Sequence, residues 1–462
     1  MALNRRNFIR GAGAGALAAG AAVGVPTVFT SHAAEVIGYK ALVCVFLFGG
    51  IDCHDVLIPS DAGSYNSWRA ARAPLVAQYG ASRDRGSLLP LSRASQPSPT
   101  GPQFALPPEL AGIRSIYDQG NAAFIANVGP LVGPVTRAGF EAGNTAVPPR
   151  LFSHNDQQVV WQAGAPEGAQ FGWGGLFADA VVASGANRSL PQFTSIVTDE
   201  AGPFSTGRQT SPYRVPIGGS NQITLLNNSP ISENQNLVNQ VRSQLASRNF
   251  AGSHVLKRDI ASAFADGIDN NALYQNAFSA GRPVIGNFGN GPLSRQLQGV
   301  AETIALRQSF SANRQIFFVS LGGFDTHSAQ ALNLTRLLTE MNDSISAFHA
   351  AMGAAGLSNQ VTLFTASDFG RTLVANGDGT DHGWGGHQMV VGGAVSGREI
   401  YGSVPPPVTG HNLDAGNGRL IPDVAVEQYA QQLGRWFGLN DAELRASLPN
   451  LGRFTAPEWR FI

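Results

Sequence analysis

Charged residues are scarce in this chain. They make up 13% of its 462 residues, whereas about 25% is usual for a soluble protein. The 31 basic and 31 acidic residues give a formal net charge of zero. With this balance, nothing argues for electrostatic capture of nucleic acid or of an anionic membrane, and we expect neither as a partner. In so uncharged a chain, a local gathering of carboxylates and imidazoles is informative.

Cysteine is nearly absent, since only Cys44 and Cys53 occur. Two cysteines do not make a disulfide framework. If both lie along one strand, their Cα atoms are about 30 Å apart at ~3.3 Å per residue, whereas a disulfide needs them within about 7 Å. We therefore expect two free, half-buried thiols, unless the chain reverses sharply at Gly49-Gly50.

Long runs of Leu, Ile and Phe are also missing. The sequence NRRNFIR at residues 4–10 is a twin-arginine motif, followed by a Gly/Ala run to about Val28 and a small-residue site ending at Ala33. A short Gly/Ala run favours a cleaved signal peptide over a membrane anchor. We expect residues 1–33 to be a twin-arginine signal peptide. The mature protein would be periplasmic or extracellular, with no stable membrane span after cleavage.

Short, uninterrupted apolar runs predict the strands. Such runs suit strands covered on both faces, as in a parallel sheet between helices. Apolar residues at steps of three and four predict helices over 328–354 and 422–437, and Asn440 to Glu443 reads as a capping box that opens a final helix. The patterning predicts an α/β protein with a mostly parallel sheet. The predicted strands are 41–48, 122–126, 315–321, 361–365 and 388–391.

Glycine and proline are abundant, with 55 and 27 residues. Pro/Ser-rich segments near 88–103 and 202–220 predict surface loops. A polar helical stretch predicts a helical cap around residues 230–280. Because no segment resembles a linker, we expect residues 34–462 to form a single domain with loop and helical insertions.

Three predicted strands end in an aspartate, and two histidines lie on the glycine-rich loop just before the strand at Gln388. In open α/β sheets the carboxyl ends of the strands face the ligand crevice. Carboxylates and imidazoles are ligands of Zn²⁺ or Mn²⁺, and clustered carboxylates repel one another without a cation. The sequence predicts a divalent metal centre of one or two ions. The expected ligands are Asp52, Asp325, His327, Asp368, His382 and His387.

Some of these aspartates could also have a purely structural role, without any metal. Asp52 or Asp368 alone fits the cap of a turn at a strand end. Asp381 fits a role behind a histidine ligand, where it would orient the ring. The metal interpretation depends on the coincidence of three strand ends.

Ser153 begins a polar stretch, Ser153-His154-Asn155-Asp156. The stretch predicts a helix start with Ser153 as N-cap. A serine at a helix N-terminus is also well placed as a nucleophile, because backbone N–H groups there favour an alkoxide and a bound oxyanion. The sequence leaves both roles open. We take Ser153 and His154 as candidate catalytic residues, and Arg371 as a fork for the substrate oxyanion.

Together these motifs resemble the bacterial domain-of-unknown-function family fifteen-oh-one, grouped with the alkaline phosphatase and sulfatase superfamily. The resemblance implies an alkaline-phosphatase-like three-layer α/β/α sandwich with a metal site at the strand ends. It implies no particular substrate. The segments that carry it are the twin-arginine start, FLFGGID (46–52), LFSH (151–154), LGGFDTH (321–327), SDFGRT (367–372) and DHGWGGH (381–387).

The chain departs from the superfamily pattern. One residue separates Asp325 from His327, and the adjacent pair Asp381-His382 comes well after Asp368, so the division of ligands between one or two ions stays open. No Cys-x-Pro-x-Arg motif occurs, which disfavours a type I sulfatase mechanism. The kinase-like DFG at 368–370 is discounted, because the chain has only two lysines and neither lies in a kinase motif.

Two functions follow as expectations. The first is an exported metal-dependent hydrolase of phosphate or sulfate esters, acting on a small-molecule or glycan ester of the envelope or of a polysaccharide. The alternative is a non-catalytic exported protein of the same fold that acts in envelope or polysaccharide assembly with a protein partner. An open coordination position would favour the first.

Overall fold

The structure is a computed structural model that describes residues 37–95, 102–199, 201–215, 235–245, 255–281 and 286–462. The predicted signal peptide lies outside these residues. Residues Ala33–Ile462 form one compact unit. Within the described part of the chain, no helix combines the length and the apolar character needed to cross a bilayer.

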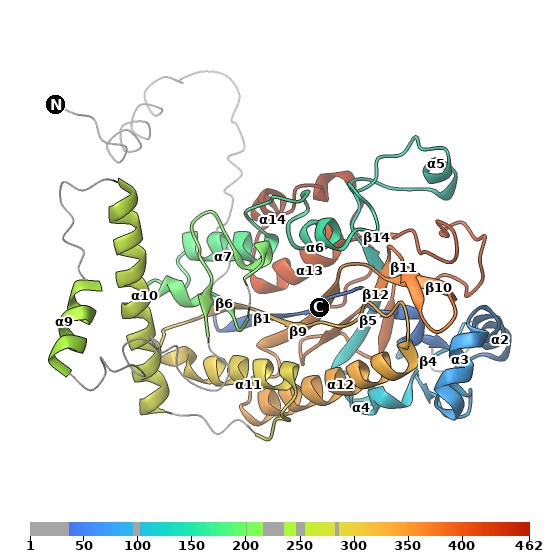
Figure 1. The fold of residues 1–462 in the computed structure, drawn as a ribbon, viewed down its shortest axis with the longest axis horizontal. Coiled ribbons are helices and arrows are strands. Elements are labelled where there is room, and N and C mark those ends of the chain that lie inside the picture. Colours follow the sequence, from blue (N-terminus) through green and yellow to red (C-terminus); the bar gives the residue numbers. More distant parts are fainter. Residues whose placement is uncertain (1–36, 96–101, 200, 216–234, 246–254, 282–285) are drawn as a thin grey trace, which may run out of the picture. The chain divides into compact units, whose positions relative to one another are not determined.

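A nine-stranded sheet forms the centre of this unit, in the order β13-β5-β12-β9-β1-β8-β6-β7, with β14 paired to β5 (Figure 1). The five predicted strands are confirmed as β1, β5, β8, β9 and β12. The strands of the sheet are β1 (Lys40–Leu47), β5 (Ala122–Gly129), β6 (Ser195–Val197), β7 (Tyr213–Arg214), β8 (Arg314–Leu321), β9 (Val361–Ser367), β12 (Gly386–Val391), β13 (Glu399–Tyr401) and β14 (Val424–Ala425).

The sheet is mostly parallel, with β12 as the exception. β1 pairs in parallel with β8 and β9, whereas β12 is antiparallel to β5 and β9. A parallel return needs a crossover, usually a helix. The segment between β9 and β12, all of it described, holds only the hairpin of β10 (Arg371–Ala375) and β11 (Thr380–His382). β12 therefore runs back against its neighbours.

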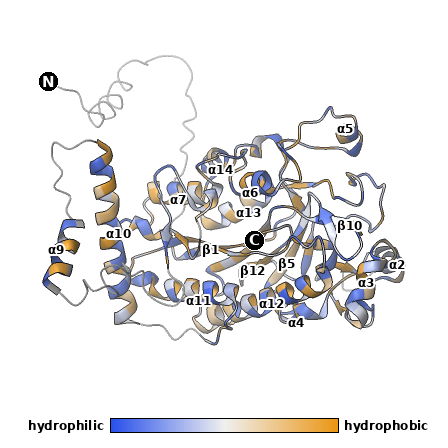
Figure 2. Cartoon of the chain, viewed as in Figure 1, coloured by the Kyte–Doolittle hydropathy of each residue, from blue (hydrophilic) through white to orange (hydrophobic). Residues whose placement is uncertain are grey.

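Helices cover both faces of the sheet. Alternate residues of β1 enter opposite cores, with Val43 on one side and Cys44 on the other. The first core is closed by α4 (Ala111–Asp118), α11 (Pro292–Ala305) and α12 (Gln330–Ala354), and the second by α6 (His154–Ala163), α7 (Trp173–Ala183), α13 (Val426–Phe437) and α14 (Asp441–Ser447). Figure 2 shows apolar strands at the centre and both apolar and polar residues on α11 and α12. This is the predicted α/β/α sandwich.

The predicted helices are found with small shifts at their starts. α12 and α13 correspond to the segments at 328–354 and 422–437, and Asn440 and Glu443 form the predicted capping box of α14. The segment predicted as a cap holds α9 (Gln235–Leu245) and α10 (Val255–Ala280). The hydroxyl of Tyr274 in α10 lies 3.1 Å from the hydroxyl of Thr303 in α11.

A smaller sheet packs beside the main one. Its strands are β2 (Ile58–Pro59), β4 (Phe104–Leu106) and β3 (Leu89–Pro90), and it lies with α2 (Ala62–Ala71) and α3 (Ala73–Tyr79). A short helix, α5 (Arg137–Glu141), precedes α6. Cys44 and Cys53 are both free, as predicted, but both are fully buried rather than half-buried.

Candidate metal centre

The carboxyl ends of β1, β8 and β9 meet at one edge of the sheet. Leu47 pairs with Leu321 of β8 on one side and with Ser367 of β9 on the other. The turns that follow these strands therefore leave side by side, as the sequence predicted. Gly49 in the first turn has φ 112°, and a Cβ there would lie 2.3 Å from the backbone nitrogen of Asp325. Only glycine allows the two turns to approach so closely.

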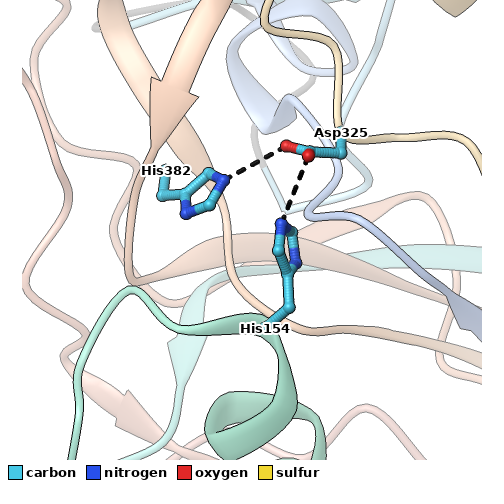
Figure 3. A group of neighbouring side chains, drawn as sticks. All are labelled: His154, Asp325 and His382. Carbon is cyan, nitrogen blue, oxygen red and sulfur yellow. Dashed lines mark hydrogen bonds and ion pairs between the residues drawn. The ribbon is translucent and has the colours of Figure 1, made fainter.

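Three ligand-type side chains converge at this edge. His154, Asp325 and His382 are potential metal ligands whose donor atoms all lie within 4.8 Å of one another. His154 Nε2 is 3.4 Å from Asp325 Oδ2, and His382 Nε2 is 3.2 Å from Asp325 Oδ1 (Figure 3). The three residues come from the start of α6, the turn after β8 and the end of β11.

The other nitrogen of each of these two imidazoles is held by an acceptor. His154 Nδ1 is 2.7 Å from Asp368 Oδ2, and His382 Nδ1 is 2.7 Å from the Phe152 carbonyl. Because a carboxylate and a carbonyl only accept, both Nδ1 atoms carry the proton in the neutral rings. Both Nε2 atoms then present a lone pair to Asp325. This is the usual arrangement of histidine ligands, whose second nitrogen is held by a carboxylate or a carbonyl.

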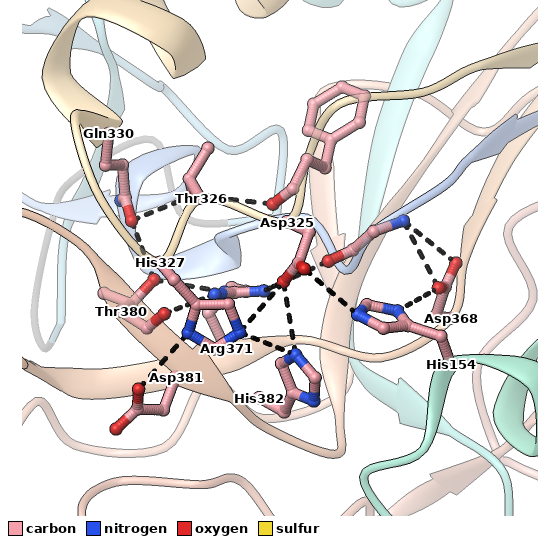
Figure 4. Close-up of polar contacts among 12 residues, drawn as sticks. His154, Asp325, Thr326, His327, Gln330, Asp368, Arg371, Thr380, Asp381 and His382 are labelled. Atoms are coloured by element: carbon pink, nitrogen blue, oxygen red, sulfur yellow. Dashed lines mark hydrogen bonds and ion pairs between the residues drawn. The ribbon is translucent and has the colours of Figure 1, made fainter.

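His327 extends the group on one side. Its Nε2 is 2.8 Å from His382 Nε2 and 3.1 Å from Asp325 Oδ1, and its Nδ1 is 3.4 Å from Asp381 Oδ1 (Figure 4). Asp381 in turn accepts a hydrogen bond from the side chain of Asn376. His327 is thus a fourth potential ligand, held from behind in the same way as the other two histidines.

Arg371 fixes the carboxylate of Asp325. The guanidinium is fully buried, and its Nη1 donates to Asp325 Oδ1 at 2.6 Å and to the Gly49 carbonyl at 3.1 Å. Its Nε and Nη2 donate to the hydroxyl and the carbonyl of Thr380. Burial opposes ionisation of Asp325, but the hydrogen bond and the charge of Arg371 outweigh it and lower the pKa of this carboxyl. Asp325 is therefore a carboxylate near neutral pH.

The pKa values of His154 and His382 are shifted in opposite directions. The hydrogen bond to Asp368 raises the pKa of His154 and outweighs the effect of its burial. Burial lowers the pKa of His382, and the Phe152 carbonyl opposes this only in part. The site therefore does not favour protonation of both His154 and His382 around Asp325.

The residues present fit a divalent cation. His154 Nε2 is buried and has no hydrogen-bond partner among the described residues. Lone pairs that face one another and a carboxylate repel without a proton or a cation between them. Two imidazoles and a carboxylate are a common catalytic zinc ligand set. The side chains of Asp325 and His327 are 43% and 45% exposed, so the group is open to solvent.

Two of the expected ligands lie outside this group. Asp52 is buried and accepts hydrogen bonds from Arg72, from Gln330 Nε2 at 2.5 Å and from the His54 backbone at 3.1 Å. Its charge is balanced by Arg72. His387 is buried below the loop, where its Nδ1 accepts from the Asn127 backbone at 3.1 Å.

Three further residues take places other than those expected. Asp368 lies behind His154 and also accepts from Gln158 Nε2 at 2.8 Å and from the Gly49 N–H. His154, expected to be catalytic, is a ligand candidate. Arg371 holds Asp325, so its donors are not arranged as a fork for a substrate oxyanion.

Ser153 begins α6, as predicted, but does not cap it through its side chain. Its hydroxyl instead donates to Asp156 Oδ2 at 2.8 Å, and Asp156 is 3% exposed. Phe152, just before it, has φ 75°, a strained conformation for a bulky residue, and its carbonyl is the group that holds His382. Ser153 thus lies between two residues that build the candidate metal centre.

Sequence reasoning missed several supporting residues. Gln158 and the Phe152 carbonyl carry no recognisable signal, because their roles depend on where α6 begins relative to the sheet. Asp156 was expected only as a helix residue, although a buried carboxylate three residues after a candidate nucleophile was a usable signal. Asp381 was expected behind a histidine, and the ring it faces is His327.

A model of the protein family of unknown function DUF1501 matches residues 39–415 of the chain. No curated protein matches the chain in a sequence comparison. Among solved structures, the chain is similar to Ps i-CgsB in complex with k-i-k-neocarrahexaose, at 9% identity and a TM-score of 0.34, over 87% of this chain and 72% of that chain.

Two further solved structures are similar at the same level. One is the zinc complex of the C-terminal periplasmic domain of EcEptC from Escherichia coli, at 9% identity and a TM-score of 0.32, over 78% of this chain and 75% of that chain. The other is the PsFucS1 sulfatase from Pseudoalteromonas sp., at 10% identity and a TM-score of 0.33, over 88% of this chain and 68% of that chain.

Proposed function

The chain belongs to the DUF1501 family, and from its candidate metal centre we propose that it is an exported, metal-dependent hydrolase of phosphate or sulfate esters. The observation that carries the proposal is the convergence of His154 Nε2, His382 Nε2 and the Asp325 carboxylate, with each ring fixed through its other nitrogen. The substrate would be a small-molecule or glycan ester of the envelope.

The metal would be Zn²⁺ or Mn²⁺, held by His154, Asp325 and His382, with His327 as a further ligand. When bound, it would supply a Lewis acid for the ester oxygens and lower the pKa of a coordinated water or hydroxyl. Arg371 keeps Asp325 ionised and in place. Asp368 and the Phe152 carbonyl keep the two ring lone pairs directed at Asp325.

Ser153 is the proposed nucleophile. Its hydroxyl proton points to the buried Asp156 carboxylate, which would accept that proton as Oγ attacks the phosphorus or sulfur atom. The ester alkoxide then leaves, and water hydrolyses the serine ester in a second step. The exposed side chains of Asp325 and His327 leave the ligand group open to a substrate.

The test combines metal analysis with an ester panel. We expect the purified mature protein to retain zinc or manganese, and to hydrolyse at least one member of a panel of p-nitrophenyl phosphate, bis-p-nitrophenyl phosphate and p-nitrophenyl sulfate. Asp325→Asn should lose both metal and turnover. Ser153→Ala should keep the metal and lose turnover.

Asp84→Asn is the matched control, because Asp84 is an exposed carboxylate paired with Arg69 outside the ligand group. It should leave metal content and turnover unchanged. A wild-type protein that binds no divalent metal contradicts the proposal. Metal binding without turnover of any ester would favour the non-catalytic role with a protein partner.

We also propose that the twin-arginine route exports the protein. The support is the NRRNFIR motif and the Gly/Ala run that follows it. Replacing Arg5 and Arg6 with lysine should hold the precursor in the cytoplasm, detected by fractionation and immunoblotting. Continued export of that variant would remove this route.

A further inference from the structure

A buried glutamine connects the two segments that carry most of the candidate ligands. Gln330, the first residue of α12, is fully buried, whereas the side chains of Asp325 and His327 are 43% and 45% exposed. The amide oxygen of Gln330 accepts the Thr326 hydroxyl at 3.0 Å and the Thr380 hydroxyl at 2.7 Å (Figure 4). Both threonines are buried as well. The exposed ligands are therefore supported from below by a buried polar group.

Each threonine belongs to a different ligand-bearing segment. Thr326 lies between Asp325 and His327 in the turn after β8. Thr380 precedes His382 by two residues in β11, so the side chains of Thr380 and His382 lie on the same face of the hairpin. The Thr380 N–H also donates to the Thr326 carbonyl at 3.1 Å. One glutamine oxygen thus joins the segment of Asp325 and His327 to the segment of His382.

The nitrogen of the same amide faces two carboxylates, which fixes the orientation of the side chain. Gln330 Nε2 donates to Asp52 Oδ2 at 2.5 Å and to Asp55 Oδ2 at 3.3 Å. Both of these oxygens also accept from the buried guanidinium of Arg72. Because they act as acceptors, the amide nitrogen must face them, and the amide oxygen must face the threonines.

The Thr380 hydroxyl continues this network to Arg371. Arg371 Nε donates to the hydroxyl at 3.2 Å, so the hydroxyl proton is directed at Gln330. Arg371 Nη1 donates to Asp325 Oδ1 at 2.6 Å. Gln330 therefore fixes the threonine hydroxyl, the hydroxyl fixes the guanidinium, and the guanidinium holds the Asp325 carboxylate.

The backbone at the start of α12 holds the tip of the hairpin independently of this side chain. The Gln330 N–H donates to the Asp378 carbonyl, and the Ala329 N–H donates to Asp378 Oδ2, both at 2.9 Å. These contacts remain when the side chain of Gln330 is replaced. A substitution can therefore remove the side-chain connection without releasing the hairpin.

We propose that Gln330 is a positioning residue of the metal centre, which holds Asp325 and His327 in register with His382. The inference rests on the proposed function, because it concerns the same site. His327 Nε2 and His382 Nε2 are 2.8 Å apart and come from the two segments that the glutamine joins. Ring lone pairs this close repel without a proton or a cation between them. Without the connection the two rings should move apart, and the ligand atoms should no longer meet at one point.

The experiment measures metal binding in Gln330→Met and Thr380→Val. Both changes nearly keep the volume of the side chain and remove its hydrogen bonds in the network. Competition with a chelator should show an affinity for Zn²⁺ that is about 10- to 100-fold lower in each variant. The visible absorption bands of the Co²⁺-loaded protein report on coordination geometry and should change. Thr380→Ser keeps the hydroxyl, so it should recover most of the affinity and the wild-type spectrum.

Thr362→Val is the matched control. Thr362 is fully buried near the start of β9, and its hydroxyl has no hydrogen-bond partner among the described residues. The change removes a buried hydroxyl without touching the ligand segments. It should leave the Zn²⁺ affinity and the Co²⁺ spectrum as in wild type. Equal losses in Thr362→Val and Thr380→Val would reduce the effect to general destabilisation and overturn the proposal.

A folded Thr380→Val protein with wild-type affinity and spectrum would also overturn the positioning role, and this variant decides the question if Gln330→Met does not fold. Neither measurement uses a substrate. A wild-type protein that binds metal but hydrolyses no ester would therefore contradict the proposed hydrolysis alone, whereas unchanged metal binding in the variants would contradict the positioning role alone.

Discussion

Each imidazole of the candidate metal centre is held through the nitrogen that does not face Asp325. Asp368 holds His154, the Phe152 carbonyl holds His382, and Asp381 faces His327. These outer groups fix the tautomer and the direction of each lone pair. Loss of an outer group should therefore weaken the metal site, whereas loss of a ligand should remove it.

Asp368→Asn tests this difference. The amide keeps the shape but no longer accepts a charge-assisted hydrogen bond from His154 Nδ1, so we expect metal affinity to fall about 10- to 100-fold. Competition with a chelator measures the affinity, and Asp325→Asn should retain no measurable metal. Asp52→Asn is the contrast, with full stoichiometry but a lower Tm, because it weakens a buried ion pair. Unchanged affinity in Asp368→Asn would show that Asp368 only caps the turn after β9.

A second test concerns His387 and pH. Burial lowers the pKa of His387 to about 3, whereas an unfolded histidine titrates near 6.5. Between these values the unfolded chain binds more protons, so stability falls as pH drops from about 6.5 toward 3, by ~1.4 kcal/mol per pH unit for this group. His387→Asn keeps an acceptor for the Asn127 N–H and should flatten the slope by that amount in urea unfolding at pH 6, 5 and 4. A slope identical to that of wild type would contradict the neutral, buried ring.

The sequence identified Asp325, His327 and His382 as ligand candidates because they follow strand ends or lie on a glycine-rich loop. It could not separate Asp52 from them. Arg72, which neutralises Asp52, lies 20 residues later along the chain, and only the packing of α2 and α3 against the turn after β1 brings the two together. A local pattern contains no information on that contact.

The strands and helices themselves were easier to predict, because continuous apolar runs and helical periodicity are local properties. The direction of β12 was harder to predict, because it depends on the connection that precedes the strand.

The turn after β1 shows how an element shapes the site. The Gly49 N–H donates to Asp368 and its carbonyl accepts from Arg371, so one backbone residue supports both His154 and Asp325 from behind.

Gly49→Ala should therefore damage the metal centre without removing any ligand. The added Cβ would meet the Asp325 nitrogen at 2.3 Å, and φ 112° is unfavourable for alanine. We expect a loss of more than about 1 kcal/mol of stability and a metal affinity reduced at least tenfold. Gly86→Ala is the matched control, because nothing lies within 4 Å of its Cβ position and its φ is unstrained. Wild-type metal affinity in Gly49→Ala would show that the two turns are not tightly coupled.

In the whole molecule, the ligand set joins segments that are distant in sequence. His154 comes from one helical layer, Asp325 from the turn that leads toward α12 in the opposite layer, and His382 from the hairpin between β9 and β12. An unfolded chain does not hold these three groups together. A cation that binds them therefore binds the folded state almost exclusively, and its binding free energy adds to the stability of the fold.

Removal of the metal should accordingly lower the Tm of the wild-type protein. At a free metal concentration of 100 times the Kd, the linkage is worth about 2.7 kcal/mol, and differential scanning calorimetry before and after chelation measures it. Asp325→Asn should show no such shift on chelation, and its Tm should lie below that of chelated wild type, because the substitution also removes the charge that pairs with the buried Arg371. A Tm that chelation leaves unchanged in a wild-type protein shown to contain metal would mean that the ion is bound elsewhere, and that His154, Asp325 and His382 are held together by a shared proton instead.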